Sequence, residues 1–97
     1  MPNYTGIEVV KNYGEYLEDV FWQSPLEYSL EQISYSRWAI SELLARLKHS
    51  PPDDELTIME KLSNELVEFS RLNPKTSRIF LIAYEIVGDA MDLYISQ

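Results

Sequence analysis

The fold is decided by residues 79–95, which read IFLIAYEIVGDAMDLYI. On a helical wheel at about 100° per residue, the polar side chains in and around this stretch fall on one narrow stripe. The stripe consists of Arg78, Glu85, Asp89, Asp92 and Ser96. Nearly every other position is apolar or small, whereas an outer helix of a small bundle leaves a broad polar face in water. This helix is therefore either central to the fold or reserves one face for another chain.

Two apolar bands run along this last helix. One band consists of Leu81, Tyr84, Gly88, Met91 and Ile95, and the other of Ile79, Ala83, Ile86, Ala90 and Leu93. Only one band is needed if the rest of the chain lies to one side of the helix. We expect the other band to form a homodimer or a partner site, with Gly88 allowing a close approach of the backbone.

Periodicity predicts three further helices before this one. The first covers residues 5–22, the second begins after Ser24 and runs to about residue 49, and the third begins at Asp53 or Asp54 and ends before Pro74. Thr76 or Ser77 is expected to cap the last helix. The connections are short, so neighbouring helices should be antiparallel. The sequence thus predicts one all-α domain over residues 1–97, a four-helix antiparallel bundle that is dimeric in one interpretation.

The second helix has a clear start and an apolar seam. Ser24-Pro25-Leu26-Glu27 matches a capping box with proline in the first turn. The positions that follow at alternating spacings of four and three are Leu26, Leu30, Ile33, Arg37, Ile40, Leu44 and Leu47. Such a heptad pattern is typical of a helix packed in a bundle.

Arg37 is the one charged residue in that seam. A buried guanidinium needs a carboxylate or carbonyl partner. Glu85, midway along the last helix, is the expected partner, which gives a structural ion pair between Arg37 and Glu85. The alternatives are an arginine whose head group reaches water past the seam, or one that awaits an anionic ligand.

Tyr28 and Tyr35 lie seven residues apart on the polar back of the second helix. Exposed tyrosines beside charged residues are typical of interface anchors. The alternative is that a central helix buries both of its sides. We take both tyrosines as candidate partner-binding residues, together with Leu81, Tyr84 and Met91 of the last helix.

The charge and composition exclude several classes of function. The net charge is −8, which disfavours binding to nucleic acid phosphates or to anionic membranes. The sequence has no cysteine and one histidine, His49, so thiolate chemistry and the usual zinc sites are excluded. No signal peptide or membrane-spanning run is recognisable, and we expect a cytoplasmic protein. No cofactor or metal is expected.

Acidic residues crowd two segments. Glu8, Glu15, Glu18 and Asp19 share the outer face of the first helix, and Asp53, Asp54, Glu55 and Glu60 surround the start of the third. If these faces adjoin, they form one negative patch that steers a basic partner. Glu15, Glu18 and Asp19 are therefore candidate partner-binding residues. The alternative is that the acidity serves solubility alone.

A second set of carboxylates carries a family resemblance. Glu65-Leu66-Val67-Glu68, followed by Glu85, Asp89 and Asp92, resembles the metal-binding pattern of the all-α nucleotide pyrophosphohydrolases (MazG-like proteins). The resemblance implies Mg²⁺ bound beside a nucleoside triphosphate. The second half departs from the family pattern, because the step from Glu85 to Asp89 is one residue too long. A solvated polar stripe is the alternative.

The sequence therefore predicts a small acidic, non-enzymatic protein-binding module with no catalytic residues. Small acidic helical proteins often regulate or inhibit a protein with a basic surface, including proteins that bind nucleic acid, and we expect such a partner here by analogy of charge and size. The alternatives are a structural homodimer without a further ligand, and a Mg²⁺-dependent hydrolase.

Overall fold

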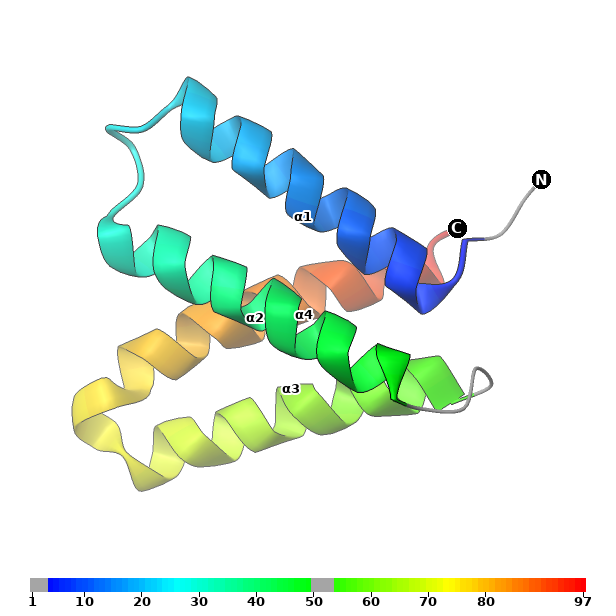
Figure 1. The fold of residues 1–97 in the computed structure, drawn as a ribbon. Helices are drawn as coiled ribbons and strands as arrows, with labels where there is room; N and C mark the ends of the chain where they lie inside the picture. The colour runs from blue at the N-terminus through cyan, green and yellow to red at the C-terminus, as the bar shows by residue number, and fades with distance from the viewer. Residues whose placement is uncertain (1–3, 50–53) are drawn as a thin grey trace.

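The computed structural model describes residues 4–49 and 54–97, and these form an all-α bundle. The elements in chain order are α1 (Gly6–Gln23), α2 (Leu30–Lys48), α3 (Glu55–Leu72), the single 3₁₀ turn η2 (Pro74–Thr76) and α4 (Ser77–Ile95). Consecutive helices run in opposite directions, as Figure 1 shows. The predicted four-helix antiparallel bundle is confirmed.

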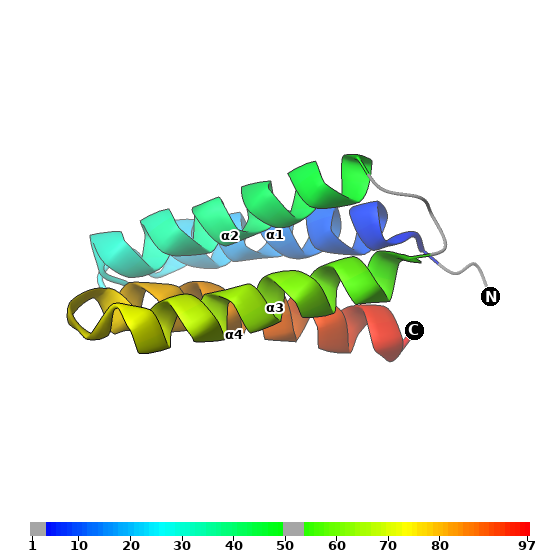
Figure 2. The same cartoon turned by 90° about the horizontal axis from the view of Figure 1, so that it is seen from below.

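The helices form two layers. Figure 2 shows α1 and α2 in one layer and α3 and α4 in the other. The molecule measures 39 × 35 × 21 Å, and its short dimension is what two stacked helices occupy. Within the described ranges, no helix is both long and apolar enough to cross a membrane.

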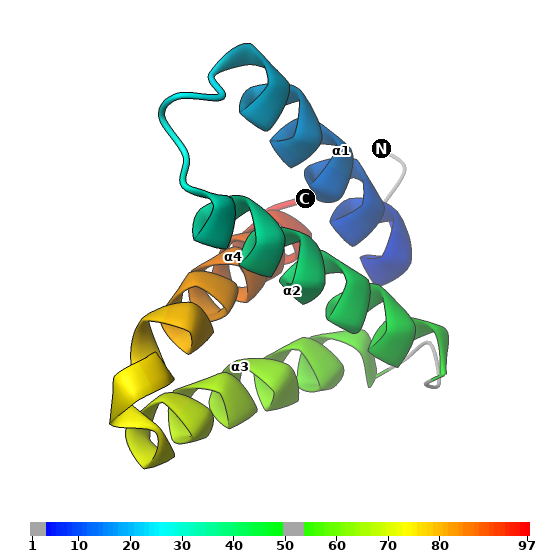
Figure 3. The same ribbon diagram turned by 60° about the vertical axis from the view of Figure 1, so that its left-hand side comes forward.

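α4 is the most extensively packed helix, and both α4 and α2 contact all three other helices. The most extensive packing of α4 is against α3 and α2, whereas α1 touches it along a shorter stretch. In Figure 3, α1 lies beside α2 on the side away from α3, and α3 and α4 diverge from their connection at η2. The excess of apolar residues in α4 is thus explained in part by this extensive packing.

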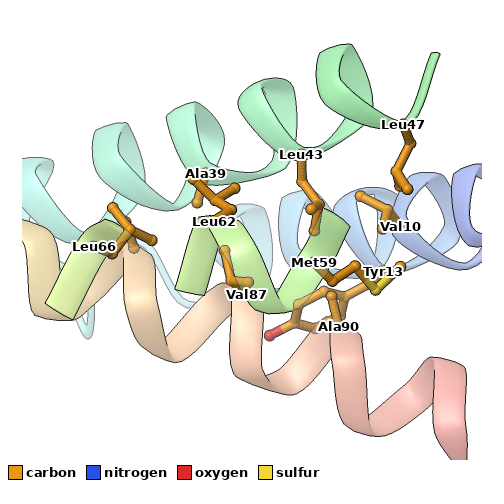
Figure 4. Packing of buried hydrophobic residues seen from close by; sticks show 11 residues of the cluster. Val10, Tyr13, Ala39, Leu43, Leu47, Met59, Leu62, Leu66, Val87 and Ala90 are labelled. Atoms are coloured by element: carbon orange, nitrogen blue, oxygen red, sulfur yellow. The ribbon is translucent and has the colours of Figure 1, made fainter. Parts of the chain in front are cut away.

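The core is a single cluster to which every helix contributes (Figure 4). Its buried members are Val10, Tyr13, Ala39, Leu43, Leu47, Met59, Leu62, Leu66, Ala83, Val87 and Ala90. The members from α4 are small or β-branched, which lets its neighbours approach its backbone closely. Because the sequence has no cysteine, packing of this cluster and the hydrogen bonds around it must hold the fold.

The predicted start of the second helix is wrong by about five residues. α2 begins at Leu30 with Ser29 as its N-cap, and Ser29 and Gln32 form a complete capping box. The capping box predicted at Ser24 does not form, because α1 continues to Gln23 and the chain reverses direction within residues 24–29. The Ser24 amide instead donates to the Val20 carbonyl oxygen and ends α1.

The predicted seam of the second helix is wrong in its first half, whereas Leu47 is buried in the core and Ile40 and Leu44 pack against it. Leu26 is fully exposed, Leu30 is 82% exposed, and Arg37 lies at the surface. The buried face consists of Ser36, Ala39, Leu43 and Leu47. The buried face of α2 is rotated about the helix axis relative to the predicted heptad seam. The sequence pattern missed this face because two of its members, Ser36 and Ala39, are small, and a pattern of large apolar residues does not include them.

Glu55 joins three helices at one end of the bundle. Its Oε2 atom accepts a 2.6 Å hydrogen bond from the Gly6 amide at the start of α1, and its Oε1 atom accepts one of 3.2 Å from the Tyr94 hydroxyl of α4. Burial, followed by the charge of Glu55, raises the pKa of Tyr94. A carboxylate at the N-terminus of α1 also complements the helix dipole. The starts of α1 and α3 therefore adjoin at Glu55.

The remaining helices, α1, α3 and α4, begin close to the positions that the sequence predicts, but of these three only α1 has a side-chain cap. Thr5 caps α1 by accepting a hydrogen bond from the Glu8 amide. Asp54 and Thr76 stand at the N-caps of α3 and α4, yet neither makes a side-chain capping bond. The other candidate cap of α3, Asp53, lies outside the described residues.

The two glycines inside helices should respond in opposite ways to alanine. A Cβ at Gly14 would lie 2.9 Å from Cγ2 of Ile40, whereas a Cβ at Gly88 meets nothing within 4 Å. We expect Gly88→Ala to raise the free energy of unfolding by about 0.5–1 kcal/mol through helix propensity. We expect Gly14→Ala to lower it by about 1 kcal/mol, because overpacking outweighs that gain. Urea denaturation measures both. A loss of stability for Gly88→Ala would instead indicate that another chain packs on this face of α4.

Candidate functional site

An open groove with a volume of about 730 Å³ lies between α1 and α4. Its lining comes from one face of each helix and from the residues that flank them. The lining residues are Tyr4, Val9, Asn12, Tyr13, Tyr16, Asp89, Asp92, Leu93 and Gln97. Three of them are large side chains that remain well exposed: Tyr4 at 50%, Tyr16 at 62% and Leu93 at 47%. The groove thus offers apolar surface to solvent.

Helical spacing places these side chains in two facing rows. Val9, Tyr13 and Tyr16 recur at the spacing of one face of α1, and Asp89, Leu93 and Gln97 do the same on α4. The rings of Tyr13 and Tyr16 are stacked with centroids 6.4 Å apart and form an aromatic floor on the α1 side. At about 1.5 Å per residue, each row is roughly 10–12 Å long, which corresponds to two turns of a helix.

A hydrogen bond ties the two walls together at the bottom of the groove. The Tyr13 hydroxyl donates to Oδ2 of Asp89 over 3.0 Å. Burial raises the pKa of Tyr13 strongly, and the hydrogen bond to Asp89 and the negative charges of Asp89 and Glu85 raise it further. Tyr13 is therefore a neutral donor at neutral pH, and Asp89 is held in a fixed position.

At one end of the groove, a second contact joins the segment before α1 to the residues that follow α4. Oε1 of Gln97 accepts a 2.7 Å hydrogen bond from the Tyr4 amide, and Nε2 of Gln97 donates over 2.8 Å to the Tyr4 carbonyl oxygen. This pair of bonds fixes the segment before α1 against the end of α4. Figure 1 shows the start of α1 beside the end of α4 at this point.

Both rims of the groove are acidic. On α4, Glu85 lies one helical turn before Asp89, and its charge acts on Tyr13 in the groove. On α1, the wheel places Glu8 and Asp19 beside Asn12 and Tyr16, whereas Glu15 lines a separate groove between α1 and α2. None of the described residues that line the groove is a lysine or an arginine. Lys11 and Arg37 line a smaller groove, of about 360 Å³, between α1 and α2.

The predicted ion pair between Arg37 and Glu85 is wrong. Arg37 lies at the surface and pairs with Glu18 of α1, with 2.9 Å between Nη2 and Oε1. Its Nε also donates to both carboxylate oxygens of Glu18, and this pairing raises the pKa of Arg37. The error follows from the rotated seam of α2, which turns Arg37 toward α1 and away from α4. Glu85 is exposed on α4.

The prediction that Tyr28 and Tyr35 are exposed on the polar back of α2 is wrong. Tyr28 lies in the loop before the helix, half-buried, with its ring edge-on to Phe21 at 5.1 Å. Tyr35 is half-buried and lines a small hollow with Trp38 of its own helix and with Ile79 and Phe80 of α4. Both rings therefore contribute mainly to packing within the chain.

The other candidate partner-binding residues divide into exposed and paired groups. Glu15 and Asp19 are exposed on α1, and Glu18 is half-buried in its pair with Arg37. On α4, Leu81 is 49% and Tyr84 is 40% exposed. Met91 is half-buried and packs against the core cluster.

The carboxylates of the hydrolase resemblance lie on different surfaces. Glu65 and Glu68 line a depression on the outer face of α3, whereas Asp89 and Asp92 line the groove between α1 and α4. Arg46 of α2 donates to both carboxylate oxygens of Glu65, which lowers the pKa of that carboxyl. Nowhere in residues 4–49 and 54–97 do three histidine or acidic side chains gather as metal ligands do.

The groove itself is the feature that the sequence pattern missed. Tyr13 and Tyr16 lie within the first helix predicted from the sequence, and Asp89 and Asp92 lie on the polar stripe of the last, but the pattern did not indicate that these two pairs meet. One signal was available, because a buried tyrosine hydroxyl needs a partner and an acidic stripe on a central helix can supply one. No protein-family model, curated protein or solved structure matches this chain. The protein is therefore described by its fold and its groove alone. It is a four-helix bundle with a groove whose floor is apolar and whose rims carry carboxylates.

Proposed function

We propose that this protein is a non-enzymatic protein-binding module that regulates or inhibits a partner with a basic surface. The observation that carries the proposal is the groove between α1 and α4, whose floor is aromatic and whose rims are carboxylates. Apolar surface bordered by charge of one sign is typical of a protein interface. The net charge of −8 adds a long-range field that favours encounter with a basic partner.

The exposed apolar residues of α4 favour a second candidate, the structural homodimer. Leu81 and Tyr84 lie outside the groove and remain about half exposed. The hydrolase alternative has less support, because Glu65 and Glu68 line one surface and Asp89 and Asp92 line another.

Photo-crosslinking in cell extract tests the proposed function. A benzophenone amino acid replaces Tyr16 in the groove, Tyr84 on α4, or Leu72 at the end of α3. We expect one protein with a basic surface to be captured at Tyr16 or Tyr84 but not at Leu72. Capture of a second copy of the chain would favour the homodimer, and capture of no protein at any position would contradict the proposal.

The purified partner then allows a kinetic test. We expect the on-rate to fall about tenfold or more between low and high salt, because salt screens the steering field over about 8–10 Å. Glu15→Lys with Asp19→Lys should reduce the on-rate at low salt. A rate that ignores both salt and charge reversal would contradict a role for the acidic surface. Mg²⁺-dependent release of pyrophosphate that Glu68→Gln and Asp89→Asn abolish would establish the hydrolase instead.

A further inference from the structure

We infer that the groove between α1 and α4 binds one amphipathic helix of the partner, with leucine-like side chains on one face and lysine or arginine on both flanks. This inference rests on the proposed function and specifies the element of the partner that this site recognises. It depends on the length of the groove, the chemistry of its floor and the charge of its rims.

The length of the groove fits a short helix. Its two walls are faces of α1 and α4, each about two helical turns long. A helix that lies between them would offer apolar side chains at i, i+3 or i+4, and i+7, as in other helix-in-groove complexes. The exposed ring of Tyr16 and the exposed side chain of Leu93, one from each wall, are placed to contact such side chains.

The rims specify the charge of the helix. Asp89 and Asp92 line the α4 wall, and helical spacing places the exposed residues Glu8 and Asp19 beside the α1 wall. A bound helix would therefore meet carboxylates on both of its flanks. Basic residues on both flanks pair with these groups, whereas an acidic or neutral helix would leave carboxylates desolvated without a partner.

The same argument disfavours a second copy of this chain as the occupant. The other half-exposed apolar side chains of α4, including Leu81 and Tyr84, share their helix with Glu85, Asp89 and Asp92. Docking that helix into the groove of another copy would bring carboxylates against carboxylates. Like charges in direct opposition weaken an interface.

A designed peptide tests the inference directly. The probe is a fluorescein-labelled helix of about four turns, made of leucine and lysine with the leucines on one face. The control peptide has glutamate in place of every lysine. Binding is followed by fluorescence anisotropy at a fixed salt concentration. We expect saturable binding of the lysine peptide, and at least tenfold weaker binding of the glutamate peptide.

Matched variants show whether the groove is the binding site. Asp92→Lys changes the charge inside the groove, and Glu60→Lys makes the same change at an exposed site on α3. Tyr16→Ala removes an exposed ring from the groove, and Leu72→Ala removes an exposed apolar side chain outside it. We expect about tenfold weaker binding for each groove variant and less than a twofold change for each control. Circular dichroism and thermal unfolding check that all four variants are folded.

Three outcomes would overturn the inference. Equal losses for Asp92→Lys and Glu60→Lys would show that the peptide responds to net charge alone, and the absence of binding would show that the groove takes no such helix. A dimer that Asp92→Lys dissociates in sedimentation velocity would show that a second copy fills the groove. None of these outcomes depends on the crosslinking experiment. A basic partner captured outside the groove would therefore preserve the proposed function while this inference fails.

Discussion

Truncation of Leu43 to alanine should lower the free energy of unfolding by about 2–5 kcal/mol, the usual cost of a cavity in a well-packed core. Leu43 is fully buried in the central cluster. The same truncation of Leu30, in the same helix, should change the stability by less than about 0.5 kcal/mol. Leu30 is 82% exposed, so its removal leaves no cavity.

This pair of variants distinguishes two ways in which α2 could pack, with the observed buried face or with the predicted heptad seam toward the core. In the heptad seam, Leu30 is a core residue and Leu43 is not. Urea denaturation monitored by circular dichroism gives both free energies. A larger loss for Leu30→Ala than for Leu43→Ala would favour the seam and contradict the packing described above.

The second large effect is a loss of stability at high pH. The pKa of Tyr13 is raised in the folded protein above the value of 10.0 expected for an unfolded chain. Below pH 10 the phenol is neutral in both states, and its contribution to stability is complete. Above pH 10 the unfolded chain releases the proton while the folded protein keeps it. The stability should then fall by up to about 1.4 kcal/mol for each further pH unit.

Substitution of Tyr13 isolates this contribution. Tyr13→Phe should flatten the fall in stability between pH 10 and pH 11.5 or so, and Tyr94 will account for part of the slope that remains. Tyr16→Phe is the matched control, because Tyr16 is stacked on Tyr13 but is 62% exposed. Urea denaturation at several pH values measures the slopes. If Tyr13→Phe and wild type lose stability in parallel, Tyr13 ionises freely and is not buried in the groove.

Much of the fold could be predicted from local pattern. The apolar excess of residues 79–95 indicated a central helix, and α4 does contact the other three helices. Proline at positions 51, 52 and 74 and the amphipathic pattern of residues 5–22 set the remaining boundaries to within a few residues. These features depend on residues that are close together in the sequence, so they can be predicted from the sequence alone.

Features that depend on packing between helices were not predictable in this way. Two capping boxes compete within residues 24–32, and the choice between them depends on where α1 ends. The rotation of α2 depends on the small residues Ser36 and Ala39, which carry no hydrophobic signal of their own. Once that rotation is wrong, the partner of Arg37 is wrong as well, because rotating the helix about its axis moves Arg37 from the α4 side to the α1 side.

The groove has a consequence for how the molecule folds. Its hydrogen bonds join residues far apart in the sequence. Tyr13 and Asp89 are 76 positions apart, and Tyr4 and Gln97 are 93 positions apart. Closing loops of this length costs about 1 kcal/mol more in entropy than closing a neighbouring hairpin of about 20 residues. The hairpin of α3 and α4 is local, whereas the groove has high contact order and needs both ends of the chain in place. A partner that binds the groove would therefore recognise only completely folded molecules.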